Sequence, residues 1–79
     1  MSAKEMFEKY GFKYQKLNND IDIRFYKVND EINIVIDFYK DKYVRIITLN
    51  GNVQFNMSKL YLAPGVVRAI NKQMEELEW

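Results

Sequence analysis

The sequence predicts an α+β fold of two layers, in which two helices cover one face of an antiparallel sheet. Three observations predict it: a short amphipathic helix pattern at the start, alternating strand patterns separated by turn residues in the middle, and a longer amphipathic helix pattern at the end. The chain of 79 residues forms a single domain, spanning residues 1–79, near the lower limit for a self-sufficient core. We expect an N-terminal helix, a meander of four to five strands and a C-terminal helix, with both helices on one sheet face.

The first ten residues, MSAKEMFEKY, carry the signals of a short helix. Ser2 is suited to cap the helix, and Glu5, three residues later, completes a capping box. Gly11 is expected to end the helix in the left-handed conformation, so that Phe12 folds back on the last turn. The apolar residues share one helix face; they are Ala3, Met6, Phe7 and Tyr10.

Five segments then alternate apolar and polar residues, as half-buried strands do. They are residues 12–16, 21–26, 32–39, 43–49 and 52–57, and the last is expected to be short. Tight turns between them predict a register that brings all apolar sets to one face. The predicted opposing pairs are Tyr14 with Ile23, Phe25 with Ile34, Phe38 with Val44, and Thr48 with Val53 across Asn50-Gly51.

The last segment, APGVVRAINKQMEELEW, predicts a helix that begins near Pro64, a residue favoured in the first turn. Ala63 is a poor N-cap, and Gly65 weakens the first turn. Trp79 is expected to fold back over the open end of the core; the alternative is that it anchors a partner, because Trp is frequent at interface hot spots. The expected apolar face of the helix consists of Val67, Ile70, Met74 and Leu77.

Composition excludes much enzyme chemistry. The chain has no Cys and no His, which removes disulfides, zinc sites built on those residues, thiol nucleophiles and His-based triads. Twelve basic and eleven acidic residues give a formal charge of +1, whereas nucleic-acid binding favours a strongly basic face. The start is no signal peptide, and no apolar run is long enough to span a bilayer. We therefore expect a cytoplasmic protein, in the host cell if its origin is viral, with no cofactor, no metal and no membrane partner.

The two ends of the chain carry a resemblance. The stretches KEMFEKYGFKY, residues 4–14, and AINKQMEELEW, residues 69–79, resemble the two ends of a group of small, mostly uncharacterised proteins from phages and prophages of low-GC Gram-positive bacteria. The match covers roughly a quarter of the chain, and Glu78 stands where the group usually has Gly. The resemblance implies a phage or prophage origin and implies no catalytic residues.

The sheet face that points away from the apolar set carries Tyr, Arg and aliphatic residues, a composition typical of interfaces. The predicted register places Tyr39 opposite Tyr43, Asp37 opposite Arg45, and Val35 opposite Ile47. It also makes Asp22 and Asp37 cross-strand neighbours; with arginines beside them, an ion-pair lattice is the favoured interpretation over a metal site. The candidate partner-binding residues are Arg24, Tyr26, Val35, Tyr39, Tyr43, Arg45, Ile47 and Trp79.

These observations predict a non-catalytic module that binds another macromolecule, with a host or phage protein as the favoured partner. One alternative is a weak single-stranded nucleic-acid binder, in which the tyrosines stack bases and the arginines contact phosphates. A second alternative is a homodimer that buries the same face. The Ser and Thr residues lack a base to activate them, so no catalytic residue is assigned.

Overall fold

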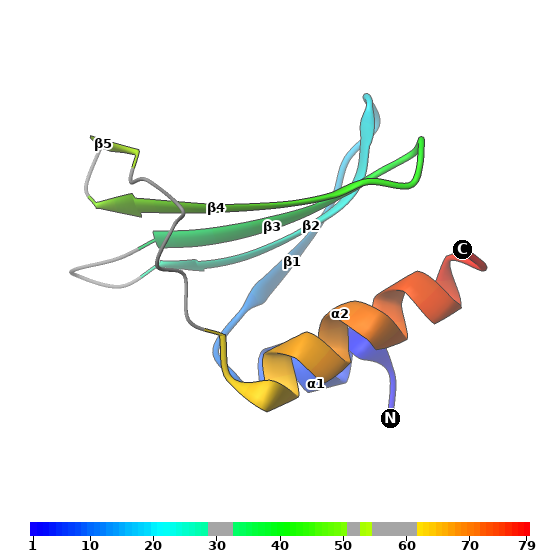
Figure 1. Ribbon diagram of the computed structural model, residues 1–79, viewed down its shortest axis with the longest axis horizontal. Helices are drawn as coiled ribbons and strands as arrows, with labels where there is room; N and C mark the ends of the chain where they lie inside the picture. The colour runs from blue at the N-terminus through cyan, green and yellow to red at the C-terminus, as the bar shows by residue number, and fades with distance from the viewer. Residues whose placement is uncertain (29–32, 51–52, 55–61) are drawn as a thin grey trace.

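The computed structural model describes residues 1–28, 33–50, 53–54 and 62–79. Two helices lie on one side of a five-stranded sheet, and the other side of the sheet is not covered by them (Figure 1). This confirms the predicted α+β fold of two layers. In chain order the elements are α1 (Ala3–Glu8), β1 (Lys13–Lys16), β2 (Ile21–Val28), β3 (Asn33–Tyr39), β4 (Val44–Asn50), β5 (Val53–Gln54) and α2 (Pro64–Glu76).

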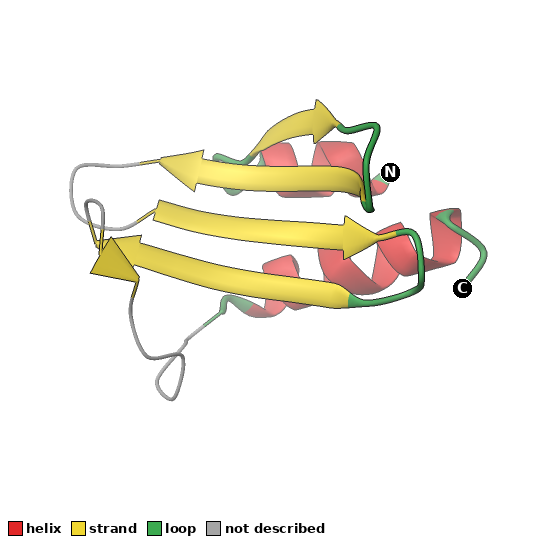
Figure 2. Ribbon diagram, turned by 90° about the horizontal axis from the view of Figure 1, so that it is seen from above, coloured by secondary structure: helices red, strands yellow, loops and turns green. Residues whose placement is uncertain are grey.

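The sheet is an antiparallel meander with strands in the order β1-β2-β3-β4-β5 (Figure 2). The predicted pairing of β3 with β4 is confirmed, with Phe38 opposite Val44 and Asp37 opposite Arg45. The loop between these strands has both the length and the position that the sequence predicts.

The other predicted registers are wrong by two residues. Tyr14 lies opposite Phe25 instead of Ile23, and Phe25 lies opposite Ile36 instead of Ile34. Longer connections cause these shifts. Between β1 and β2, the Leu17 N–H donates to the Asp22 carbonyl at 3.0 Å. The side chain of Asn19 accepts the Ile21 N–H at 2.8 Å, as in an Asx turn. A shift by two keeps side chains on their predicted faces. At the start of β2 the register is irregular, because Ile21 lies opposite Tyr39 whereas Ile23 lies opposite Phe38.

The turn between β4 and β5 lies one residue later than predicted. Asn50 pairs with Val53, so Thr48 is not opposite Val53. The predicted continuation of the last strand through residues 55–57 lies outside the described residues.

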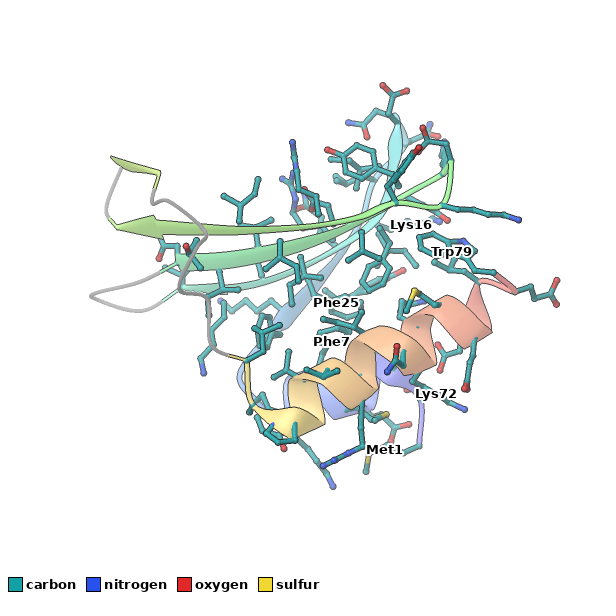
Figure 3. All side chains as sticks on the ribbon, viewed as in Figure 1. Met1, Phe7, Lys16, Phe25, Lys72 and Trp79 are labelled. Carbon is teal, nitrogen blue, oxygen red and sulfur yellow. The ribbon has the colours of Figure 1, made fainter. Side chains whose placement is uncertain are left out.

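Aromatic rings from three elements form the centre of the core. Phe7 of α1 stacks on Phe25 of β2 with ring centroids 3.9 Å apart, and Figure 3 shows the two rings between helix and sheet. Phe38 of β3 meets both rings edge-on. All three side chains are fully buried, and their ring contacts attach α1 to the middle of the sheet.

The helix α1 begins and ends as the sequence predicts. Ser2 and Glu5 form the capping box. Gly11 has φ of +85°, the Phe12 N–H donates to the Phe7 carbonyl at 3.2 Å, and the Gly11 N–H donates to the Glu8 carbonyl at 3.0 Å. This hydrogen-bond pair is a Schellman motif, and the ring contact between Phe7 and Phe12 is its apolar part.

The helix α2 starts at Pro64 as predicted, and Ala63 makes no side-chain cap. Its buried face differs from the prediction, since Val67 is 44% exposed and Val66 is buried. The reason is that α2 packs against α1 as well as the sheet, which widens and rotates the buried stripe. That stripe consists of Gly65, Val66, Ala69, Ile70 and Gln73.

The two helices run antiparallel, because the start of α1 meets the end of α2. The Glu76 carboxylate accepts the Ala3 N–H at 2.7 Å. At the other end, the Tyr10 ring occupies the space that a Cβ on Gly65 would need. Neither helix in the described ranges is long and apolar enough to cross a bilayer.

Candidate functional site

The candidate site is the sheet face opposite the helices, here called the outer face. Figure 2 looks onto this face, with both helices behind the sheet. Strand alternation places its side chains, because residues directly opposite each other on paired strands point to the same side. The outer face includes Lys13, Gln15, Asp22, Arg24, Tyr26, Val28, Asn33, Val35, Asp37, Tyr39, Arg45 and Ile47.

An ionic cluster lies at the centre of the outer face. The Asp37 side chain on β3 is fully buried beneath two arginines from the neighbouring strands. Arg24 donates to it twice, from Nε at 2.7 Å and from Nη2 at 3.2 Å. Arg45 donates once, from Nη2 at 3.0 Å. The register creates this cluster, because Arg24 and Arg45 both lie directly opposite Asp37.

The two arginines differ in environment. The hydrogen bonds to Asp37 raise the pKa of the Arg24 guanidinium above its usual value, because they favour its charged form. Arg24 and Asp37 therefore form a charge-assisted pair. Arg45 is the more exposed, with 49% of its side chain accessible against 31% for Arg24. Its guanidinium also lies over the Tyr39 ring, 5.3 Å from the centroid.

Apolar side chains flank the ionic cluster. Val35 lies opposite Tyr26 on one side and Ile47 on the other, and all three are partly exposed. A hollow of about 240 Å³ lies beside them and is lined in part by Gln15 and Arg24. The face therefore combines aliphatic, aromatic and guanidinium groups, as the centres of protein interfaces do.

Six of the eight predicted site residues lie together on the outer face: Arg24, Tyr26, Val35, Tyr39, Arg45 and Ile47. Tyr43 lies just before β4, where its carbonyl accepts the Tyr39 N–H at 2.8 Å. The Tyr43 side chain is 67% exposed at the end of this face.

Trp79 does not belong to this surface. Its ring lies on the helix side of the sheet, 6.1 Å from Phe38 (Figure 3), where it packs against the core. Its position matches the expectation that it covers the open end of the core.

The predicted neighbour relation between Asp22 and Asp37 is wrong, because the register shift puts Arg24 opposite Asp37. Asp22 pairs with Lys16 instead. The favoured interpretation of the aspartates, an ion-pair lattice, is what the geometry shows. Within the described ranges, no group of three or more acidic side chains is placed to hold a metal ion.

The burial of Asp37 is the feature that the sequence did not predict. Alternation alone places it on a half-exposed face, yet its side chain has no accessible surface. The sequence does contain a signal for this burial, because Arg24 and Arg45 lie on the strands that flank Asp37. Their side chains are long enough to cover a short carboxylate between them.

The chain was compared with protein-family models, curated proteins and solved structures, and none of them matches it.

Proposed function

We propose that this chain is a non-catalytic interaction module of phage or prophage type, which binds a host or phage protein through the outer face. The observation that carries the proposal is the composition of that face around the Arg24–Asp37–Arg45 cluster. Tyrosine, arginine and aliphatic side chains gather there on adjacent strands of the sheet, and the helices cover only the opposite side. The phage part of the proposal rests on the resemblance of the two chain ends.

The ionic cluster supports binding more than catalysis. The Asp37 carboxylate has no accessible surface, and its oxygens already accept three hydrogen bonds from two guanidiniums, so it is poorly placed to contact a substrate. It does fix the positions of the two arginines. Side chains that are already fixed lose less entropy on binding, and Arg and Tyr are enriched at interface hot spots.

The test is a pull-down from a lysate of a low-GC Gram-positive bacterium, with the tagged full chain as bait and with and without nuclease. We expect a protein band that survives nuclease and that Tyr39→Ala and Arg45→Ala each remove. Arg68→Ala is the matched control, since Arg68 is an exposed cation on α2. A band that both outer-face variants retain, while their circular dichroism stays unchanged, contradicts the proposed surface.

The charge of the outer face favours one alternative, single-stranded nucleic acid. Lys13, Arg24 and Arg45 outnumber Asp37 there, and Asp22 is compensated by its ion pair with Lys16, which leaves a formal excess of two positive charges. The exposed ring of Tyr43 is free to stack on a base. This alternative predicts that recovery disappears with nuclease and that affinity falls steeply as salt rises.

A further inference from the structure

We propose that the partner presents a carboxylate to Arg45, and that Arg45 is the residue that recognises it. The inference rests on the proposed function, because it names the chemistry of the partner that the outer face binds. The argument begins with the charge balance of the cluster, in which two guanidiniums share one carboxylate.

The uncompensated positive charge lies on Arg45. Arg24 engages both oxygens of Asp37 through Nε and Nη2, the two-point geometry of a strong Arg–carboxylate pair. Arg45 adds a single contact to the oxygen that Arg24 Nη2 also reaches. Asp37 is therefore largely neutralised by Arg24, and the half-exposed guanidinium of Arg45 carries the remaining charge at the surface.

Arg45 is also held ready to bind. Asp37 accepts a hydrogen bond from one nitrogen of the guanidinium. The guanidinium carbon lies over the Tyr39 ring, 5.3 Å from the ring centroid. A guanidinium has five N–H donors, and the bond to Asp37 is the one hydrogen bond found for this side chain within the described residues. The remaining donors form a planar fork that matches the two oxygens of a carboxylate.

The surroundings of Arg45 would strengthen such a contact. Ile47 lies two residues further along the same face of β4, and Val35 lies opposite it. Tyr43, two residues before Arg45, is 67% exposed. A partner covering these side chains would exclude water around the ion pair, and a desolvated pair contributes more to affinity than an exposed one.

The same observations disfavour the other two occupants. A second copy of the chain would bring together two faces of the same charge sign, which opposes a symmetric contact. For nucleic acid, one face of the Tyr39 ring is already covered by the Arg45 guanidinium, so that face cannot stack on a base. An acidic protein surface is the occupant that these contacts fit.

A display library of random peptides of about a dozen residues, panned against the immobilised full chain, tests the inference. We expect the selected peptides to be rich in Asp and Glu. For a synthetic copy of the best peptide, Arg45→Gln should weaken binding by about tenfold or more, and Arg45→Lys should weaken it several-fold because the charge stays while the fork is lost. Arg68→Gln is the matched control and should leave the affinity unchanged.

The outcomes separate the two proposals. Peptides without acidic enrichment, which lose affinity with Ile47→Ala but not with Arg45→Gln, overturn the carboxylate inference and leave the proposed function standing. Both proposals are contradicted if no peptides are selected, or if no outer-face substitution changes the affinity of the selected peptides.

An oligodeoxythymidine that binds more tightly than the peptides, with a steep salt dependence, overturns the inference in favour of nucleic acid. Circular dichroism confirms that each variant is folded, and Arg45→Lys keeps the test valid if Arg45→Gln unfolds.

Discussion

At the scale of single residues, Asp37 is the side chain on which the outer face depends. A carboxylate without accessible surface is stable only when its charge is compensated by close partners. Arg24 supplies two of the three hydrogen bonds and Arg45 the third. The two arginines have the same chemistry but unequal structural roles.

This inequality predicts unequal losses of stability. We expect Arg24→Gln to lower the free energy of unfolding by about 2–3 kcal/mol, because it leaves a buried carboxylate with one contact. Arg45→Gln should cost about 1 kcal/mol, because the two-point pair with Arg24 remains. Urea unfolding followed by circular dichroism measures both, with Arg68→Gln as a surface control. Equal losses, or a larger loss for Arg45→Gln, would show that Arg24 is not the main partner of the Asp37 carboxylate.

At the scale of elements, both helices end in the same Schellman geometry with different residues at its left-handed position. In α1 the position is Gly11, with φ of +85°, whereas after α2 it is Glu78, with φ of +60°. The Trp79 N–H donates to the Met74 carbonyl and the Glu78 N–H to the Glu75 carbonyl, each at 3.0 Å. The turn therefore forms without glycine, and it directs Trp79 back to Phe38.

Glu78→Gly should stabilise the protein by about 0.5–1 kcal/mol, since a residue with a Cβ is strained at positive φ and glycine is not. The gain is partly offset by the greater freedom of glycine in the unfolded chain. Glu78→Ala is the matched control, because it removes the carboxylate and keeps the strain. Thermal melting of the three proteins gives the comparison, and an equal gain from Ala and Gly would attribute the effect to charge instead of backbone conformation.

The contact between the helices explains a glycine that is unfavourable for α2 itself. Gly65 weakens the first turn, yet the Tyr10 side chain fills the place of its Cβ. Close approach of α1 to the start of α2 therefore depends on this position being small.

A double-mutant cycle tests this contact. We expect Gly65→Ala alone to be neutral or destabilising, because the Tyr10 ring must move. In a Tyr10→Ala background the same change should stabilise by about 0.5–1 kcal/mol, the helix-propensity difference between Ala and Gly. Chemical denaturation of the four proteins gives the coupling, and the same gain in both backgrounds would show that Tyr10 and Gly65 are independent.

At the scale of the whole molecule, charge and packing are divided between the two sides of the sheet. The helix side holds the aromatic core, and the outer side holds the ionic cluster, in which two guanidiniums share one carboxylate. A second copy docked on the outer side would meet the same excess of positive charge.

We therefore expect a monomer of 9.5 kDa in light scattering at concentrations of about tens of micromolar, near physiological salt. High salt screens the repulsion between the positive outer faces of two copies. An apparent mass that increases from low to high salt would therefore agree with an excess of positive charge on this face. A dimer already present at low salt, and disrupted by Ile47→Ala, would identify the outer face as a homodimer interface and contradict the proposed function.

Local patterns in the sequence are sufficient to specify the layers, the element types and the two faces of the sheet. The capping box at Ser2, the stop at Gly11 and the start at Pro64 are local signals, and each acts within a few residues of itself. Side chains alternate along a strand whatever its pairing, so the predicted faces held even where the register was wrong by two residues.

The residues that meet across the strands and between the helices depend instead on the three-dimensional arrangement of the elements. The pairing of Arg24 with Asp37 depends on the length of the connection between β2 and β3, and a loop length cannot be inferred from turn composition alone. With α2 packed against α1, Val67 is exposed. The same packing places Glu76, at the acidic end of α2, where its carboxylate accepts the Ala3 N–H. These features are non-local, because each depends on how separate elements are brought together.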